Sequence, residues 1–376
     1  MNSDLFEQAN IKGIQLKNRF VRSATFEGMA TTDGSPTQML KDLYCRFADG
    51  AVGLIITSLG RIEAWKNSPD TLGLLTPFAM YDDRYIDLWQ ELIEAVHSRD
   101  TRIAMQIGHI GRQDFPELRG SAPIAPSAVP IAVSGVTPRE MQKHEIADMV
   151  DKYAQSSRRV KDAGFDAVQF DGRHGNLMHN FISPFTNIRT DEYGGSTENR
   201  ARFIVEVVNR ARELVGPDYP LMIKMNFDDF IDGGLTKDEA VNVAKIIVQA
   251  GIECIEVSGG TLSESKNHIA VKGIDKEEKE AYFAPYAKAL KEQVAIPVIL
   301  VGGLRSFRVA ERIVEDGVAD LISMSRPFIR EPELIKRWQN GDVRKSKCVS
   351  CNQCFESFAI RSQRCYMENP LENDQQ

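Results

Sequence analysis

The chain has 376 residues, of which 42% are hydrophobic and 26% are charged, and its formal net charge is −7. This composition is typical of a globular protein and argues against disorder or a fibre. It shows no basic face for nucleic acid, no apolar run near the roughly 18 to 20 residues of a membrane span, and no signal-peptide pattern. We therefore expect a cytoplasmic protein that acts on a small molecule and binds neither nucleic acid nor a membrane.

Short apolar runs rich in β-forming residues predict eight strands along the chain. They occupy residues 20–25, 51–58, 102–107, 167–170, 221–225, 254–257, 297–301 and 320–324. Segments with helical spacing separate most of them, including 146–160 and 236–250, the second opening with a capping box from Thr236 to Glu239. This alternation predicts an α/β protein and favours a closed (β/α)8 TIM barrel over an open doubly wound sheet.

The barrel is expected to span residues 1–340, with a short hairpin around Gly13 closing its bottom. Two long insertions, residues 111–143 and 258–279, are either functional covers or mobile surface. Residues 341–376 form a cysteine-rich C-terminal tail that is too short to hold its own hydrophobic core.

Loops at the carboxyl ends of barrel strands carry the chemistry of this fold, so residues after each strand are candidates for a site. Gly302 and Gly303 follow the seventh strand, and Ser325 and Arg326 follow the eighth. Exposed glycine amides beside an arginine predict a phosphate site there. The alternative is a tight turn and a surface ion pair.

Gln106 ends the third strand and Lys224 lies in the fifth. A glutamine and a lysine suit the edge of a bound flavin ring, because one donates and accepts hydrogen bonds while the other stabilises negative charge. Both side chains could instead satisfy buried neighbouring groups.

The fourth strand ends in a block of polar residues that includes Asp171, His174 and Asn176. His174 could donate a hydrogen bond to a substrate carbonyl as charge develops on it, or it could belong to a structural network held by Asp171. Four aromatic residues could shape the pocket or belong to the core: Phe26, Trp65, Tyr81 and Phe185.

Five parts of the chain carry a resemblance to a known family: residues 16–25, 106–112 and 183–200, the Gly302-Gly303 pair and the Ser325-Arg326 pair. In these parts the chain resembles the Old Yellow Enzyme family of NAD(P)H:flavin oxidoreductases, as far as about residue 340. The resemblance implies a TIM-barrel enzyme whose FMN is reduced by NAD(P)H and reoxidised by an activated alkene of the enone or enoyl type, or by a similar acceptor.

The resemblance also implies roles for individual residues. Ser23, Ala24 and Thr25 would line the flavin, Gln106 and Lys224 would contact its ring, Gly302, Gly303, Ser325 and Arg326 would hold its phosphate, and Gly260 would belong to the same rim.

The chain departs from the family pattern at the substrate. Family members usually present a His-x-x-His or His-x-x-Asn pair and, two positions later, a tyrosine that donates a proton, whereas this chain has Asp171, His174 and Asn176. We expect Asp171 and His174 to be catalytic and all three residues to contact the substrate. An ionised Asp171 would favour a basic or hydroxylated substrate, or would raise the pKa of His174 so that a histidinium donates the proton.

Four of the six cysteines, Cys348, Cys351, Cys354 and Cys365, lie in the tail at a spacing typical of a metal site. In larger family members, such as 2,4-dienoyl-CoA reductase and trimethylamine dehydrogenase, a similar segment binds a [4Fe–4S] cluster. We expect such a cluster here, with zinc or free thiols as the alternatives. We also expect no further electron-transfer domain after Gln376, so that a cluster is either structural or served by an external partner.

Two other functions stay open at this level. One is a dehydrogenase that takes hydride from an amine or another electron-rich substrate and passes electrons to the cluster. The other is a barrel without redox chemistry that binds a sugar phosphate and carries a zinc-stapled tail. We expect a homo-oligomer in each case.

Overall fold

The strands form one closed parallel barrel in the computed structural model, which describes residues 3–358 and 360–367. The eight barrel strands are β3 (Phe20–Arg22), β4 (Leu54–Arg61), β6 (Arg102–Gly108), β9 (Ala167–Gly172), β10 (Leu221–Asn226), β11 (Cys254–Ser258), β12 (Val298–Leu300) and β13 (Leu321–Met324). Strand β3 pairs with β13 on one side and with β4 on the other, which closes the ring. The predicted TIM barrel and all eight predicted strands are therefore confirmed.

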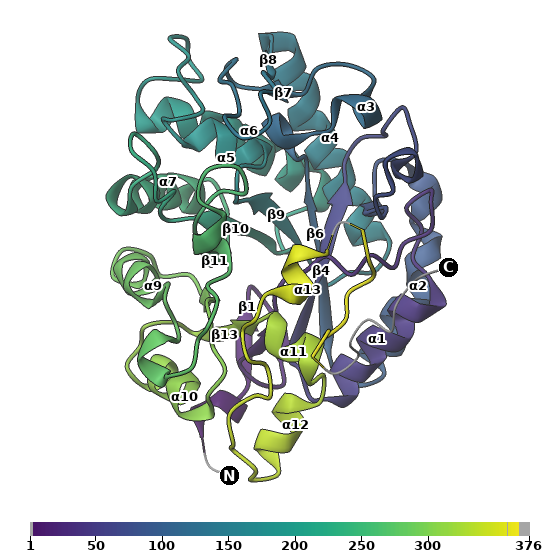
Figure 1. Ribbon diagram of the computed structural model, residues 1–376, viewed down its shortest axis with the longest axis vertical. Helices are drawn as coiled ribbons and strands as arrows, with labels where there is room; N and C mark the ends of the chain where they lie inside the picture. Colours follow the sequence, from purple (N-terminus) through teal and green to yellow (C-terminus); the bar gives the residue numbers. More distant parts are fainter. Residues whose placement is uncertain (1–2, 359, 368–376) are drawn as a thin grey trace.

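Helices surround this barrel (Figure 1). They include α1 (Gln38–Asp49), α2 (Gln90–His97), α4 (Lys143–Asp162), α6 (Thr197–Val215), α7 (Lys237–Gln249), α9 (Ala284–Lys291), α10 (Phe307–Glu315) and α12 (Leu334–Gln339). Helix α7 begins after Thr236, and the predicted capping box with Glu239 is present. Helix α4 covers the predicted segment and buries Ile146, Met149 and Tyr153 against the barrel.

The short elements lie mainly in the loops. The short helices are α3 (Pro116–Arg119), α5 (Leu177–Ile182), α8 (Lys266–Ile269), α11 (Arg326–Arg330) and α13 (Gln353–Glu356). The single 3-10 turns are η1 (Asp4–Phe6), η2 (Pro69–Leu72), η3 (Asp83–Tyr85), η4 (Asp87–Trp89), η5 (Gly111–Gln113) and η6 (Glu277–Lys279). The short strands are β5 (Phe78–Ala79), which extends the barrel sheet beside β4, and β7 (Ile124–Ala125) with β8 (Arg139–Glu140), which pair with each other.

The N-terminal hairpin has the predicted place in the fold. Strands β1 (Ala9–Ile11) and β2 (Ile14–Leu16) pair antiparallel around Lys12 and Gly13. Ile11 and Leu16 are fully buried and belong to the same apolar cluster as the inward side chains of the barrel, among them Leu54, Met222 and Leu321. The hairpin therefore closes the end of the barrel opposite the site.

The first barrel strand is shorter than predicted. It ends at Arg22 rather than at residue 25, and beyond its end the side-chain hydroxyl of Thr25 donates to the carbonyl of Ser23. Residues 23–25 consequently lie in the loop at the carboxyl end of the strand, which is the end that carries the site.

The C-terminal tail lies on the barrel instead of extending from it. Figure 1 shows its helix α13 in front of the barrel strands and near α11. Ser362 donates its hydroxyl to the carbonyl of Gly28, and the backbone N–H of Gln363 donates to the carbonyl of Glu27. Residues 368–376 of the predicted tail lie outside the described residues. No helix in the described part of the chain combines the length and hydrophobicity needed to cross a membrane.

We expect the substitution Leu321→Ala to lower the free energy of unfolding by about 2 to 5 kcal/mol, because it leaves a cavity in the closely packed barrel interior. Urea denaturation followed by circular dichroism measures the change. Val133→Ala is the control, since Val133 is 78% exposed and its replacement should change stability by less than about 0.5 kcal/mol. Equal stability of the two variants would contradict this account of the core.

Candidate functional site

A buried carboxylate, Glu256 on β11, joins several strands inside the barrel. Its Oε1 accepts hydrogen bonds from Ser23 Oγ at 2.6 Å, Ser323 Oγ at 3.0 Å and Lys224 Nζ at 3.0 Å. Burial by itself would raise the pKa of Glu256, but the Lys224 ammonium and these donors lower it. Lys224 is thus held by an ionised partner and by Ser23 Oγ at 2.7 Å.

A chain of amides leads from this carboxylate to the mouth of the barrel. Gln169 on β9 donates to Glu256 Oε2 at 3.0 Å, and Gln106 on β6 donates to Gln169 Oε1 at 2.8 Å. The carbonyl oxygen of Gln106 then accepts from Arg173 Nη2 at 3.1 Å. Gln106 is fully buried and its side chain is fixed by both neighbours.

Arg173, to which the sequence analysis assigned no role, lies at the centre of the polar block after β9. Its Nε lies 3.3 Å from Asp171 Oδ1 without a well-aligned hydrogen bond, and its Nη1 lies 2.5 Å from His174 Nδ1. Arg173 lines both of the cavities described below. The fourth strand therefore brings a positive charge to the site in addition to the expected aspartate and histidine.

His174 is held as a neutral imidazole. Arginine cannot accept a hydrogen bond, so Nδ1 accepts from Arg173 and the ring proton resides on Nε2, which lies 2.8 Å from Ser258 Oγ. Burial, Arg173 and Lys224 together lower the pKa of His174 well below its ordinary value. The expectation that Asp171 would raise this pKa and produce a histidinium is wrong, because burial and the positive charges of Arg173 and Lys224 all lower it.

Backbone geometry also fixes His174. Its φ of 57° lies in the left-handed region that side chains other than glycine rarely adopt. The side chain of Asn226 on β10 holds this turn, accepting the backbone N–H of His174 at 3.2 Å. Strain of this kind persists only where the surroundings hold it, and it is often found at functional sites.

Asp171 and Asn176 form a pair. Asn176 Nδ2 donates to Asp171 Oδ2 at 2.6 Å, while Asp171 Oδ1 has no aligned hydrogen-bond donor among the described residues. Burial raises the pKa of Asp171, although Arg173 and Asn176 oppose the shift. The predicted substrate residues Asp171 and Asn176 thus share one wall of the second cavity.

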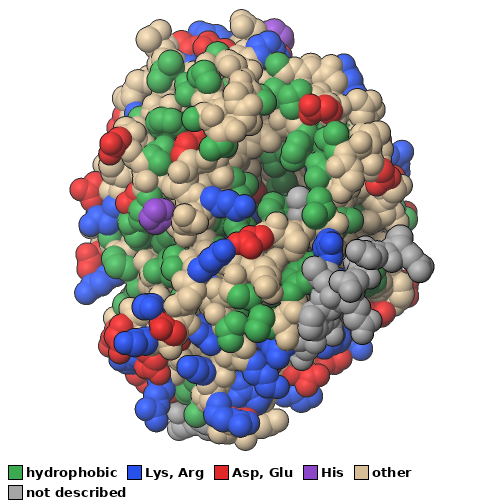
Figure 2. Space-filling model, in the orientation of Figure 1, with side chains coloured by type: hydrophobic (Ala, Val, Ile, Leu, Met, Phe, Trp, Pro, Cys, Tyr) green, Lys and Arg blue, Asp and Glu red, His purple; other side chains and the backbone are tan. Residues whose placement is uncertain are grey.

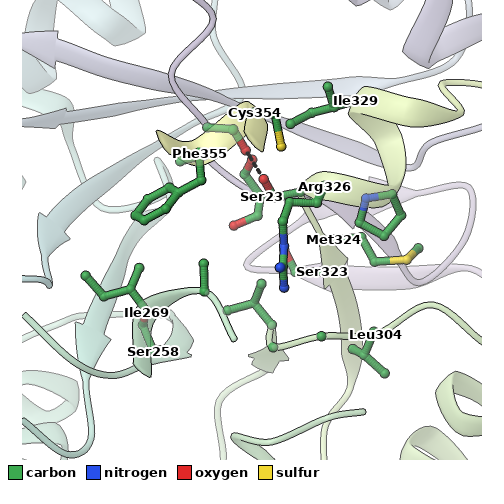
Figure 3. Close-up of a pocket in the computed structure, with 18 of the residues that line it drawn as sticks. Ser23, Ser258, Ile269, Leu304, Ser323, Met324, Arg326, Ile329, Cys354 and Phe355 are labelled. Carbon is green, nitrogen blue, oxygen red and sulfur yellow. Dashed lines mark hydrogen bonds between the residues drawn. The ribbon is translucent and has the colours of Figure 1, made fainter. Parts of the chain in front are cut away.

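The first cavity, of about 200 Å³, opens at the carboxyl ends of the barrel strands. Its walls include most of the residues expected to hold a flavin: Ser23, Ala24, Thr25, Lys224, Gly302, Gly303, Ser325 and Arg326. Figure 3 shows Arg326 extending from α11 among the residues that line this cavity, with Phe355 and Cys354 of the tail nearby. Two expected residues do not line it, namely Gln106, which lies beneath the site, and Gly260, whose carbonyl accepts from Asn226.

The wall formed by the glycine loop is suited to an anion. The backbone N–H groups of Gly303 and Leu304 donate no hydrogen bond to any described residue, and Arg326 lines the same wall. Gly303 has a φ of 73°, and a Cβ there would lie 2.4 Å from Ile274 Cδ1. This position therefore requires glycine, and the loop offers amide donors to a phosphate.

The next two amides of that loop are already used. Glu280 accepts the backbone N–H groups of Arg305 at 2.7 Å and of Ser306 at 2.8 Å, as well as the Ser306 hydroxyl. A phosphate would consequently bind at Gly303, Ser325 and Arg326 and not at the start of α10.

The second cavity, of about 260 Å³, adjoins the first, and both are lined by Thr25, Phe26, Arg173, Leu262 and Phe358. Both insertions contribute to its walls, through Phe115 and Leu262. The face in Figure 2 is hollowed near its centre, where hydrophobic side chains gather. Of the four aromatic candidates, Phe26 and Trp65 line this second cavity.

The most distinctive sequence segment of the resemblance has a structural role. Arg189 forms a bidentate pair with Asp191 and donates to the carbonyls of Pro126 and Met141, which fixes the first insertion. Arg200 donates to the carbonyl of Ile182 at 3.0 Å. These arginines position the loops around the site and do not line either cavity.

The tail cysteines gather around one small cavity. Cys348, Cys351, Cys354 and Cys365 all line a space of about 20 Å³ that Arg326 also borders. Burial raises the pKa of Cys354 to about 12 and also raises the pKa of Cys348. In the described part of the chain, no three potential ligands are close enough together to form a metal-binding group. The four thiols are the right kind of donors for a metal, and the structure brings them near one another without forming its coordination shell.

Known proteins resemble this chain over most of its length. The model of the NADH:flavin oxidoreductase / NADH oxidase family matches residues 4–344. An NADH oxidase of Thermoanaerobacter brockii is 37% identical over 366 residues, which are 95% of this chain and 55% of that protein. An NADPH dehydrogenase of a Geobacillus species, strain WCH70, is 34% identical over 334 residues, which are 88% of this chain and 92% of that protein.

A solved structure of 2-naphthoyl-CoA reductase in complex with 2-naphthoyl-CoA superimposes with a TM-score of 0.87 at 26% identity, covering 96% of this chain and 56% of that one. The chain thus spans about half the length of the longer proteins that it resembles, and nearly the whole length of the shorter one. On these grounds the chain belongs to the NADH:flavin oxidoreductase / NADH oxidase family, as its resemblance to the Old Yellow Enzymes implied.

Proposed function

We propose that this chain is an FMN-dependent oxidoreductase in which NAD(P)H supplies a hydride and an activated alkene, or a similar acceptor, receives it. The main support for the proposal is the lining of the first cavity. It includes Arg326 and Lys224 together with Gly303 and Leu304, whose backbone N–H groups donate no hydrogen bond to a described residue. Family membership supports the same conclusion.

In this proposal the glycine loop, Ser325 and Arg326 hold the phosphate of FMN, and Lys224 faces its ring. When bound, FMN supplies the capacity to accept a hydride from a nicotinamide and to donate one to the second substrate. Burial lowers the pKa of Lys224, and Glu256 opposes this shift and holds the side chain in place through the contact of 3.0 Å. Gln106 acts through Arg173, which it orients, and is a positioning residue.

The substrate's oxygen is proposed to lie near the Nε2 proton of His174. This proton is donated to Ser258 in the structure, so a substrate carbonyl would compete with the Ser258 hydroxyl for it. The Arg173 guanidinium beside the ring adds positive charge that stabilises negative charge on such an oxygen. Asp171 and Asn176 form the neighbouring wall and shape the approach of the substrate.

The amine-dehydrogenase alternative rests on Asp171 and on the cysteines. Asp171 would attract a cationic amine, but Arg173 lies 3.3 Å from it and opposes that charge. An aspartate whose charge is offset in this way gives a cationic amine donor no advantage. Family membership argues against the third alternative, a barrel without redox chemistry.

A [4Fe–4S] cluster held by Cys348, Cys351, Cys354 and Cys365 is the further part of the proposal, with zinc as the less favoured metal. It is supported by the shared cavity of the four thiols and by the long relatives, which match the chain over 366 residues and thus into the tail. Electrons from such a cluster would leave to a partner domain or protein outside this sequence. The homo-oligomeric state and the cytoplasmic location stay predictions from the sequence.

We expect the purified protein, loaded with FMN, to show flavin absorption that bleaches anaerobically when NADH or NADPH is added, and to recover its colour when an enone such as 2-cyclohexenone follows. The visible spectrum measures both steps. Replacing Arg326 by alanine should weaken FMN binding at least about tenfold, because a charge-assisted contact to the phosphate is lost. Flavin that resists both nicotinamides would contradict the reductase function.

We expect that titration of His174 does not change the rate of acceptor turnover between about pH 6 and 8. Because the pKa of His174 lies well below its ordinary value, the imidazole is already neutral throughout this range and its charge does not change. Rates of flavin reoxidation measured against pH test this. A fall of about tenfold per pH unit toward alkaline pH would instead indicate a histidinium donor. His174→Ala should lower the reoxidation rate by about a hundredfold or more.

We expect iron and acid-labile sulfide in protein purified without oxygen, and we expect Cys351→Ser to remove both. Cys45→Ser is the matched control, since Cys45 lies on α1 outside the tail and its replacement should leave the metal content unchanged. Zinc without acid-labile sulfide would show a zinc site in place of the cluster. Equal metal content in the wild type and in Cys351→Ser would show that these cysteines do not bind the metal.

A further inference from the structure

Asp229, in the loop after β10, is a fully buried carboxylate to which the proposed function assigns no role. Its Oδ1 accepts hydrogen bonds from His179 Nε2 at 2.6 Å and Asn226 Nδ2 at 3.1 Å. Its Oδ2 accepts from Ser183 Oγ at 2.6 Å and from the backbone N–H of Leu235 at 2.9 Å. Burial by itself would raise the pKa of Asp229, but His179 and the other donors lower it to about 2, so the group is ionised at neutral pH.

Two branches lead from Oδ1 of Asp229 to the turn that presents His174. In the first, Asn226 Oδ1 accepts the backbone N–H of His174 at 3.2 Å, while Asn226 Nδ2 donates to the carboxylate. In the second, His179 Nδ1 accepts the backbone N–H of Gly175 at 3.1 Å, while His179 Nε2 donates to the carboxylate. One carboxylate oxygen therefore orients both side chains that hold the amides of this turn.

This turn has an uncommon backbone conformation. The angle φ is 57° at His174 and 89° at Gly175, so two consecutive residues lie in the left-handed region. A backbone of this kind persists where its surroundings hold it. The imidazole of His174 contacts Arg173 on one side and lies 2.8 Å from Ser258 Oγ on the other. A change in the turn would consequently move the ring away from both contacts.

Both branches require a hydrogen-bond acceptor at both oxygens of Asp229, because four donors surround the carboxylate. A side-chain amide in its place would have one acceptor and one donor group. The backbone N–H of Leu235 cannot change its role, so the amide oxygen would turn toward it and the NH2 group would face His179. The ring proton of His179 would then move to Nδ1, and the N–H of Gly175 would lose its acceptor.

We propose that Asp229 is a positioning residue for the reaction at this site, and that it acts through Asn226 and His179 to hold the imidazole of His174 where the oxygen of the acceptor binds. Asp229, Asn226 and His179 line neither of the two cavities, so they act on the reaction through the turn. This inference rests on the proposed function insofar as His174 acts on the acceptor. It adds the group that determines where His174 lies.

The substitution Asp229→Asn tests this role, because it changes the hydrogen-bonding groups and nearly preserves the size of the side chain. In the FMN-loaded protein, we expect the rate of flavin reoxidation by saturating 2-cyclohexenone to fall at least about tenfold, since a displaced His174 no longer meets the acceptor's oxygen. The dissociation constant of FMN should stay unchanged, because neither Asp229 nor its two partners line the first cavity.

Histidine NMR spectra of the FMN-loaded protein separate positioning from a general loss of stability. Long-range 15N correlations show which ring nitrogen carries the proton, and the wild type should show His174 and His179 protonated at Nε2. In Asp229→Asn, the proton of His179 should move to Nδ1 and the ring signals of His174 should shift. The amide proton of Gly175 should exchange with solvent at least about tenfold faster, because it has lost its acceptor.

Two control variants accompany Asp229→Asn. Asp238→Asn makes the same chemical change at the start of α7, where the side chain is 91% exposed, and it should leave the rate and the spectra unchanged. Ser183→Ala removes a donor to Oδ2 and keeps both branches at Oδ1, so it should lower the melting temperature without shifting the signals of His174. If Asp229→Asn behaved like Ser183→Ala and kept the wild-type reoxidation rate, Asp229 would be a structural residue and the proposal would be overturned.

A second variant keeps the proposal testable if Asp229→Asn does not fold. Asn226→Ala cuts the branch to the N–H of His174 and leaves His179, Ser183 and Leu235 bound to Asp229. It should also lower the reoxidation rate at least about tenfold and shift the signals of His174. A wild-type rate in Asn226→Ala would overturn the proposal.

Failure of the inference and failure of the proposed function are distinguishable. A flavin that neither nicotinamide reduces would contradict the proposed function, whereas shifted His174 signals in Asp229→Asn would still show that Asp229 positions this ring. Conversely, unshifted His174 signals in Asp229→Asn would overturn the positioning role even if both nicotinamides reduce the flavin.

Discussion

The site depends on the ionised Glu256 inside the barrel. A carboxylate without exposed surface exists at this position because Lys224, Ser23, Ser323 and Gln169 all donate to it. These donors belong to different strands, so one buried charge holds the ends of β9, β10, β11 and β13 and the loop after β3 in register. Removing any donor would leave the carboxylate partly unsatisfied in a region of low dielectric, which is costly.

A chain of hydrogen bonds leads from Glu256 through Gln169 and Gln106 to Arg173, on the side proposed for the substrate. Arg173 then determines the tautomer of His174, and it places a positive charge beside Asp171. The electrostatics of the outer site are thus set by groups that do not face the substrate. The aspartate, which on its own suggests a cationic ligand, thus lies beside an arginine that offsets its charge.

The barrel could be predicted from the sequence, because apolar strands alternate regularly with amphipathic helices. The phosphate site could also be predicted, because barrels of this fold commonly bind phosphate at the loops after strands seven and eight. The sequence also indicated most of the first cavity, since Ser23, Gly303 and Arg326 lie directly after strands. The direction of the His174 pKa could not be predicted, because it depends on Arg173 and Lys224, whose distances from the ring arise only when the strands are assembled.

Glu256 and Gln169 could have been found from the sequence. A glutamate and a glutamine within otherwise apolar strands, on the alternate positions that face the barrel interior, require buried partners. Arg173 could not have been found in this way, because a single arginine after a strand is ordinary in sequence. Only the assembled site shows that Arg173 contacts both Asp171 and His174.

The C-terminal tail packs on the barrel and contributes to the walls of both cavities. Phe358 lines both cavities, and Ser362 and Gln363 are hydrogen-bonded to the backbone of residues 26–28. The family model matches residues 4–344, but the lining of both cavities continues beyond that range. A domain boundary placed where the barrel repeat stops would separate residues that line the same cavity. For this chain, the residues that line the cavities therefore extend beyond the barrel repeat into the tail.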